Sequence, residues 1–264
     1  MLAGITDESL PLELTTVEEL IGLDNAKLFE LEQHRTALRD FQTDKPNVYK
    51  ENQVIPVRTL RHLGHGGWAQ VDCVENAVTG AQMARKRFRL KRTQAKKLKQ
   101  SFETEIASLK KLNGHQHIIR YLYSYETEQT LNILLSPVAN CNLYEYLEEE
   151  EYEHELGNRN DILIQSLGCL ASALAFMHQH RIRHKDVKSQ NVLLYQHDGT
   201  TRIIVTDFGI SFDFSSKDNS VTEGATHKTR KYCSPEVARD SPRGRKSDVY
   251  SLGCIYLEIL TVLS

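Results

Sequence analysis

The sequence predicts an α+β fold with two lobes, one rich in β-strands and the next mainly helical. Between about residues 56 and 136, short runs rich in β-branched and aromatic residues alternate with turn signals, apart from one helical segment. From about residue 142 onward, longer apolar segments dominate and are mainly helical. Strands first and helices later favour two packed lobes with a cleft between them.

The composition is that of an ordinary globular protein. The 264 residues are 40% hydrophobic and 26% charged, and the net charge of −2 gives no overall attraction to nucleic acid, so no nucleic-acid partner is expected. The five cysteines are odd in number and form no C-x-x-C pair, which favours reduced thiols and an intracellular location, cytoplasmic or nuclear. No signal peptide is visible, and the apolar stretches near 162–177 and 252–263 are short for a membrane span, so we expect buried helices there.

Residues 1–55 are predicted to be a helical extension followed by a linker. Thr15 and Glu18 have the spacing of a capping box at the start of a helix. Apolar residues such as Leu31 then fall near one helical face, and Pro46 is expected to end the helix. The helix either packs on the next domain as an ordinary amphipathic element or binds a partner, including a second copy of the chain.

The elements that follow are predicted from strand and helix signals along the chain. Strands are expected near 57–60, 71–74, 82–86, 121–125 and 131–135, with a helix across 95–112 before the last two. Residues 56–264 are therefore assigned to one domain, with a β-rich lobe over about 56–136, a connector over about 136–141 and a helical lobe over about 142–264.

A glycine cluster, Gly64-His65-Gly66-Gly67, lies between the first two predicted strands of this domain. Glycine lets backbone N–H groups approach phosphate oxygens without a Cβ in the way, so this loop is a candidate phosphate cradle. A tight hairpin turn is the other interpretation of the same residues. The loop is not a Walker A sequence, because no G-K-[ST] follows it.

Two polar runs further along the chain carry groups suited to a metal-bound triphosphate. The first contains Asp186, Lys188 and Asn191, and the second begins at Asp207. Asp186 can accept a proton from a hydroxyl group, and Lys188 can neutralise charge on a phosphoryl group in transfer. Asn191 and Asp207 offer the hard oxygen ligands that Mg²⁺ prefers.

These runs resemble the catalytic loop and the DFG motif of the eukaryotic-type protein kinase family. The matching residues are His184-Lys185-Asp186-Val187-Lys188-Ser189-Gln190-Asn191 and Asp207-Phe208-Gly209. Residues 64–71, 83–86 and 229–236 likewise resemble the glycine-rich loop, the V-A-I-K strand and the end of the activation segment. The resemblance runs from about residue 56 to the last residue. It implies a bilobal, protein-kinase-like fold, ATP and Mg²⁺ as cofactors, and a protein substrate with an acceptor Ser or Thr, because Lys188 matches the serine/threonine kinases.

The resemblance also implies roles for individual residues. The catalytic set is Asp186, Lys188, Lys86, Glu105 and Thr229. The nucleotide-binding set is Leu63, Gly64, Gly66, Gly67, Val71, Ala84, Lys86, Ser136 and Val138. The metal-binding set is Asn191 and Asp207. Glu103 competes with Glu105 as the partner of Lys86, and the connector residues are open to a shift of one position.

The sequence departs from the family pattern at three places. Ala69 stands where the third glycine of the loop usually lies, and Lys185 replaces the arginine that usually precedes Asp186. The resemblance ends inside the long central helix of the helical lobe, in which Asp248 is expected to brace the catalytic loop. We expect several apolar residues of that helix to lack cover and the chain by itself to be unstable or aggregation-prone; they are Leu252, Ile255, Tyr256, Leu257, Ile259, Leu260 and Leu263.

Several alternatives stay open at this point. The fold can serve as a binding or scaffold protein without catalysis, the chain can be an inactive truncated fragment, or the substrate can be a small molecule. The basic run 85–99 fits either a solvated surface or a nuclear-localisation or nucleic-acid patch, and the acidic residues 145–155 fit either a solvated helix or contact with basic substrates. Hydroxyl residues between Asp207 and Glu236 are candidate phosphorylation sites.

Overall fold

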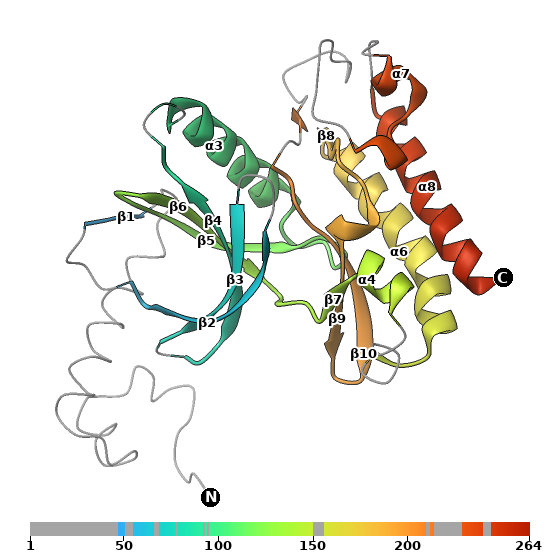
Figure 1. Cartoon of the computed structure of the whole chain (residues 1–264), viewed down its shortest axis with the longest axis horizontal. Coiled ribbons are helices and arrows are strands. Elements are labelled where there is room, and N and C mark those ends of the chain that lie inside the picture. The colour runs from blue at the N-terminus through green and yellow to red at the C-terminus, as the bar shows by residue number, and fades with distance from the viewer. Residues whose placement is uncertain are drawn as a thin grey trace, which may run out of the picture.

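The computed structural model has a β-rich lobe and a helical lobe, as the sequence predicts (Figure 1). It describes residues 47–50, 55–65, 69–77, 79–91, 93, 95–149, 156–209, 212–213, 229–239 and 244–264. The strands are β1 (Asn47–Tyr49), β2 (Val57–His65), β3 (Ala69–Asn76), β4 (Gln82–Arg89), β5 (Arg120–Thr127), β6 (Thr130–Ser136), β7 (Cys141–Asn142), β8 (Ile182–Arg183), β9 (Val192–His197), β10 (Thr200–Val205) and β11 (Phe212–Asp213). The α-helices are α3 (Ala95–Leu112), α4 (Leu143–Glu148), α6 (Arg159–Gln179), α7 (Pro235–Ala238) and α8 (Lys246–Leu263), with 3-10 helices η2 (Ser189–Asn191) and η3 (Arg230–Tyr232).

The first lobe is a six-stranded sheet in the order β1-β5-β6-β4-β3-β2, with α3 packed against it (Figure 1). The alternation of side chains along the strands gives the sheet two different faces. One face packs against α3 through a core that includes Phe88, Phe102 and Leu109. The other has its own smaller core, which includes Met83 and Tyr125. The α+β class and all five strands predicted for this lobe are confirmed.

The strand β1 was not predicted and extends the sheet beyond β5. It runs parallel to β5, whereas every other neighbouring pair in this sheet is antiparallel. Tyr49 is buried, and its ring meets the ring of Tyr125 edge to face, with 5.8 Å between their centroids. Three residues are too few for a periodic sequence signal, and the pairing partner lies far along the chain. The predicted helix before Pro46 lies outside the described residues.

The second lobe is built around α6 and α8, which pack against each other, with the small sheet β10-β9-β7 beside α6. By length and composition, α6 is the only helix among the described residues that could cross a membrane. Leu163, Leu170 and Met177 on this helix are buried in the protein core, which is what we expect for a core helix.

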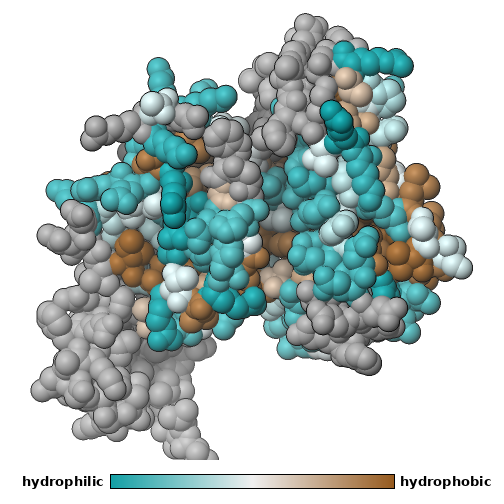
Figure 2. Space-filling model, in the orientation of Figure 1, coloured by the Kyte–Doolittle hydropathy of each residue, from teal (hydrophilic) through white to brown (hydrophobic). Residues whose placement is uncertain are grey.

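The apolar residues of α8 divide into buried and exposed ones. Leu252, Ile255 and Ile259 are buried in the core, so the expectation that they lack cover is wrong. Leu257 and Leu260 are exposed, and hydrophobic side chains gather on the outer edge of the lobe along this helix (Figure 2). The 3.6-residue helical period explains the division, because one stripe faces α6 and the other faces away.

The two lobes are joined by backbone hydrogen bonds as well as by the connector after β6. The amide of Ile119 donates to the carbonyl of Val205, and the amide of Val205 donates to the carbonyl of His117, both over 2.9 Å. These bonds attach the α3–β5 loop to the end of β10. The residues that immediately follow β10 are therefore held close to the first lobe.

Candidate active site

The first group of site residues is an ion cluster formed by three separate elements. Lys86 lies on β4, Glu105 on α3, and Asp207 follows β10. The Nζ atom of Lys86 lies 2.7 Å from Oε1 of Glu105 and 2.7 Å from Oδ1 of Asp207. Glu105 is buried, whereas Glu103 is exposed on another face of α3. Of the two candidate glutamates, the structure therefore brings only Glu105 to Lys86.

The electrostatics of this cluster favour an ionised lysine between two carboxylates. Burial alone lowers the pKa of Lys86, but attraction to Glu105 and Asp207 outweighs burial and raises that pKa above its ordinary value. Burial raises the pKa of Glu105, and the ammonium group of Lys86 opposes that rise. The same ammonium group lowers the pKa of Asp207 to about 2, although burial acts in the opposite direction. Asp207 is therefore a carboxylate at neutral pH.

Gly209 gives this cluster the space that it needs. A Cβ on Gly209 would lie 3.3 Å from Oδ1 of Asp207 and 3.4 Å from Oε2 of Glu105. The first distance is tighter than most Cβ contacts and the second is at the lower limit of ordinary van der Waals contact, so a Cβ there would press on Asp207. A residue larger than glycine at position 209 would therefore require the Asp207 carboxylate to shift.

A second cluster surrounds Asp186 in the loop before η2. Lys188 donates to Oδ2 of Asp186 over 2.6 Å, and the hydroxyl of Thr229 donates to Oδ1 over 2.9 Å. The side-chain amide of Asn191 donates to the backbone carbonyl of Asp186 over 2.8 Å. The structure therefore brings together four residues that the sequence analysis singled out. Within the described part of the chain, Oδ1 of Asn191 and Oδ2 of Asp207 have no hydrogen-bond partner.

The loop that carries Asp186 is held by Asp248 at the start of α8. Oδ1 of Asp248 accepts from the backbone amide of Lys185 over 2.9 Å, and Oδ2 accepts from the amide of His184 over 3.0 Å. Lys185 has φ of 70°, a left-handed conformation that a residue other than glycine rarely adopts. A buried carboxylate that holds two successive amides can maintain this conformation. His178 on α6 adds a third contact, with Nε2 3.0 Å from Oδ2 of Asp248.

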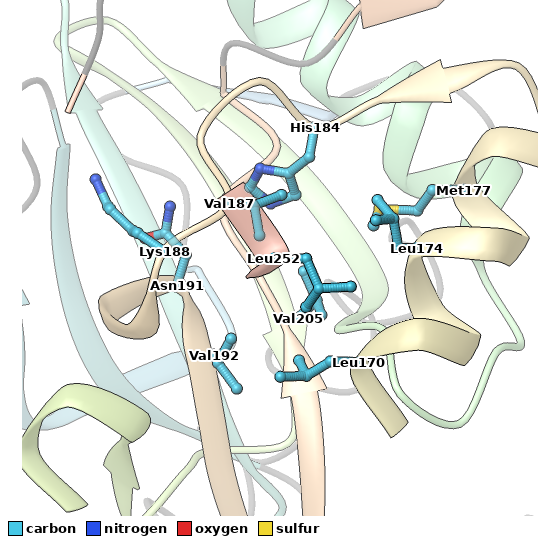
Figure 3. A pocket seen from close by; sticks show the side chains of 10 residues that line it. All are labelled: Leu170, Leu174, Met177, His184, Val187, Lys188, Asn191, Val192, Val205 and Leu252. Carbon is cyan, nitrogen blue, oxygen red and sulfur yellow. The ribbon is translucent and has the colours of Figure 1, made fainter. Parts of the chain in front are cut away.

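The loop is also joined to the segment that carries Asp207. Nε2 of His184 lies 2.9 Å from the carbonyl oxygen of Thr206, and the rings of His184 and Phe208 lie 5.0 Å apart. Beneath the loop is a cavity of about 10 Å³, too small for a ligand, lined mainly by apolar side chains of α6, β9, β10 and α8 (Figure 3). In that view the polar ends of Lys188 and Asn191 point away from the apolar side chains. The loop thus rests on a packed core and presents its polar groups outward.

Three of the expected nucleotide-binding residues share one face of the first sheet, and two others lie at the connector. Val71 pairs directly with Lys86 across the strands, and Ala84 lies two residues before Lys86, so the three side chains share a face. Gly64 pairs with Val71 near the end of β2, next to Leu63. Ser136 ends β6, and Val138 lies in the connector after it. Gly66 and Gly67 lie outside the described residues.

Metal binding at this site would depend on oxygen ligands. No group of three or more His, Cys, Asp or Glu side chains that could hold a metal ion occurs in the parts of the chain that the structure describes. His115 and His117 instead serve structural contacts, since His115 lies against Phe176 and Nδ1 of His117 lies 2.9 Å from the carbonyl oxygen of Ile203. Asp207 and Asn191 offer two oxygen ligands, which fits Mg²⁺ completed by phosphate oxygens and water.

One network of polar contacts near the site was not predicted from the sequence. The hydroxyl of Tyr232 on η3 donates to Oε1 of Glu258 on α8 over 2.8 Å and lies 2.8 Å from Oγ of Ser189. Lys231 also contacts Glu258, with Nζ 2.5 Å from Oε1. The available signal was Glu258 itself, a charged residue that interrupts the apolar sequence of α8. Residues 229–232 are therefore anchored at both ends, at Asp186 and at α8.

Comparison with known proteins shows similarity to kinases along most of the chain. The family model described as "Protein kinase domain" matches residues 57–263. The chain is 30% identical over 196 residues to calcium/calmodulin-dependent protein kinase type 1 of Caenorhabditis elegans, covering 73% of this chain and 52% of that protein. It is 33% identical over 206 residues to serine/threonine-protein kinase PrkC of Bacillus subtilis (strain 168), covering 76% of this chain and 30% of that protein. The matched region thus spans about half of the first relative and less of the second.

Proposed function

Because this chain belongs to the protein kinase family, we propose that it transfers the γ-phosphoryl group of Mg-ATP to serine or threonine hydroxyls of proteins. The observation that carries this proposal is the cluster of Lys86, Glu105 and Asp207. A buried cation held by a helix carboxylate on one side and by an ionised aspartate on the other fits phosphate and metal handling. Oδ2 of Asp207 and Oδ1 of Asn191 have no hydrogen-bond partner among the described residues. Such oxygens are available to bind a metal ion, whereas a cluster with a structural role alone does not need them.

Nucleotide binding is assigned to the sheet face shared by Val71, Ala84 and Lys86 and to the connector at Ser136 and Val138. Lys86 would hold phosphate oxygens, and Glu105 would keep the lysine in place. When bound, ATP supplies the phosphoryl group and Mg²⁺ neutralises charge on its phosphates. Asp207 and Asn191 are the residues that would hold the metal, because they offer hard oxygen ligands.

Asp186 is assigned to the acceptor hydroxyl. Thr229 and Lys188 each hold one of its carboxylate oxygens, so the group has a fixed direction before the substrate arrives. Asp186 would orient the hydroxyl and accept its proton, and Lys188 would balance negative charge on the phosphoryl group. The presence of Lys188 supports serine or threonine as the acceptor.

A binding or scaffold role without catalysis is the second candidate. Ala69 and Lys185, which depart from the family pattern, favour it. The retained cluster around Lys86 and the orientation of Asp186 favour catalysis, so we rank the scaffold role second. An intracellular setting is proposed with either role, because all five cysteines lie in the described residues as free thiols. A partner for the extension before Pro46 also remains a proposal.

The test is transfer of labelled γ-phosphate from Mg-ATP to a mixed set of serine and threonine peptides. Asp186→Ala removes the proposed base, Asp207→Asn removes the proposed metal ligand, and the exposed Asp198→Asn serves as the matched control. We expect transfer by the wild type and the control and loss of at least about a hundredfold in the first two variants. Transfer at the wild-type rate in Asp207→Asn would refute the metal assignment. Binding of Mg-ATP without any transfer would favour the scaffold role.

A further inference from the structure

The turn η3 carries two basic residues, Arg230 and Lys231, and follows directly on a residue that contacts Asp186. It begins directly after Thr229, whose hydroxyl donates to Oδ1 of Asp186 over 2.9 Å. It ends at the buried Tyr232, which contacts Ser189 and Glu258. With both ends anchored, the residues between them have a fixed position relative to Asp186.

Arg230 lies between these anchors and is exposed. Among the described residues its guanidinium group has no hydrogen-bond or ion-pair partner. Arginine keeps its charge at any physiological pH and can bind a carboxylate or a phosphate through two parallel hydrogen bonds. An exposed, unpaired arginine on an anchored turn beside the acceptor site is therefore suited to contact residues that flank the acceptor.

Three carboxylates near the same site are already occupied. Asp186 is held by Lys188 and Thr229, and Asp248 by two backbone amides and a histidine. Oε1 of Glu258 accepts from Tyr232 and pairs with Lys231, while its Oε2 is buried. A basic residue of a substrate would thus find none of these three carboxylates open.

The residues around η3 are also positively charged, as Arg230 is. Between Glu223 and Glu236 there is no aspartate or glutamate, whereas Lys228, Arg230 and Lys231 are basic. Charge complementarity therefore favours an anionic substrate segment.

We propose that this chain selects acceptor residues flanked by anionic groups, and that Arg230 is the residue that recognises them. The recognised chemistry is a carboxylate or a phosphate monoester, supplied by Asp and Glu or by a residue phosphorylated beforehand. The inference rests on the proposed function, because it concerns the substrate of that same site. Arg230 acts here as a specificity-determining residue and takes no part in the transfer itself.

The test uses the whole chain and one serine peptide made in four versions. The residues on both sides of the acceptor are Asp and Glu, phosphoserine, alanine or arginine, and kcat/KM is measured for each with Mg-ATP. We expect the two anionic peptides to exceed the alanine peptide about tenfold, and the arginine peptide to be the poorest substrate. The preference should shrink as salt concentration rises, because the contact is exposed. The relation between the Asp and Glu peptide and the phosphoserine peptide identifies the natural source of charge.

Three variants assign the preference to Arg230. Arg230→Glu should reverse the order of the acidic and arginine peptides, and Arg230→Lys should keep the order with a smaller ratio. The matched control is Arg202→Glu, which reverses the charge of an exposed arginine on β10 and should leave the order unchanged. An unchanged order in Arg230→Glu would overturn the inference.

Peptide binding measured by fluorescence anisotropy separates this inference from the proposed function. Equal binding of the acidic, alanine and arginine peptides overturns the inference, whatever the transfer assay shows. Preferred binding of the anionic peptides with no transfer to any peptide supports the inference and counts against the proposed catalysis.

Discussion

The ammonium group of Lys86 lies 2.7 Å from the carboxylate of Asp207, although 121 residues separate the two along the chain. The same ammonium group lies 2.7 Å from Glu105. One cation therefore connects the sheet, the helix packed on it and the segment that follows β10. Removal of that cation should affect all three.

Lys86→Met should leave Glu105 as a buried carboxylate without its cation. Breaking a buried ion pair by removing one partner costs about 3–5 kcal/mol, so we expect a loss of that order in the free energy of unfolding measured with urea. The pKa of Asp207 should rise from about 2 toward its ordinary 3.8, which carboxyl NMR can follow. The exposed Lys97→Met is the control and should change neither quantity. An unchanged free energy of unfolding together with an unchanged pKa of Asp207 would contradict this role of Lys86.

Acid should weaken the fold through Asp207. Its pKa in the folded protein, about 2, lies below its ordinary 3.8, so the ionised form stabilises the fold above pH 3.8. That contribution should disappear as the pH falls from 3.8 to about 2. Urea midpoints measured across this interval should fall more steeply for the wild type than for Asp207→Asn. The exposed Asp198→Asn should follow the wild-type curve.

Asp248→Asn should destabilise the loop that carries Asp186. A carboxamide offers one acceptor oxygen where the carboxylate offers two, and its NH₂ group would face an N–H donor from the loop. An unsatisfied buried donor costs about 1–3 kcal/mol, so the melting temperature and the rate of phosphoryl transfer should both fall. Asp161→Asn, at an exposed position of α6, should affect both much less. Equal effects of the two substitutions would argue against the bracing role.

Tyr49→Ala tests whether β1 is an integral part of the sheet. Tyr49 is 7% exposed and packs on Tyr125, so loss of its ring should cost about 3 kcal/mol or more in the free energy of unfolding. The neighbouring Val48 is 67% exposed, and Val48→Ala should stay within about 0.5 kcal/mol of the wild type. Chemical unfolding of both variants gives the comparison. Similar small losses would show that the sheet does not depend on β1.

The parts predicted well from sequence are those that depend on local patterns. Strands β2 to β6 follow from short runs of strand-forming residues between turns, and the choice of Glu105 over Glu103 follows from the faces of one helix. The parts that were missed depend on contacts between distant segments. The pairing of β1 with β5 and the contact of Tyr232 with Glu258 produce no periodic pattern in the sequence. The cover over Ile255 and Ile259 was misjudged because the packing of α6 on α8 is a tertiary property.

The attachment of the loop that carries Asp186 to α8 has a consequence for the order of folding. The amide of His184 and the carboxylate that holds it are 64 residues apart, so this contact closes a long loop and carries a corresponding entropic cost. Contacts of this range form late in many folding reactions, after local helices and hairpins. In a refolding experiment, we expect helical circular dichroism to recover before phosphoryl transfer does. Enzymatic activity would then report the last step of assembly, the docking of the loop onto α8.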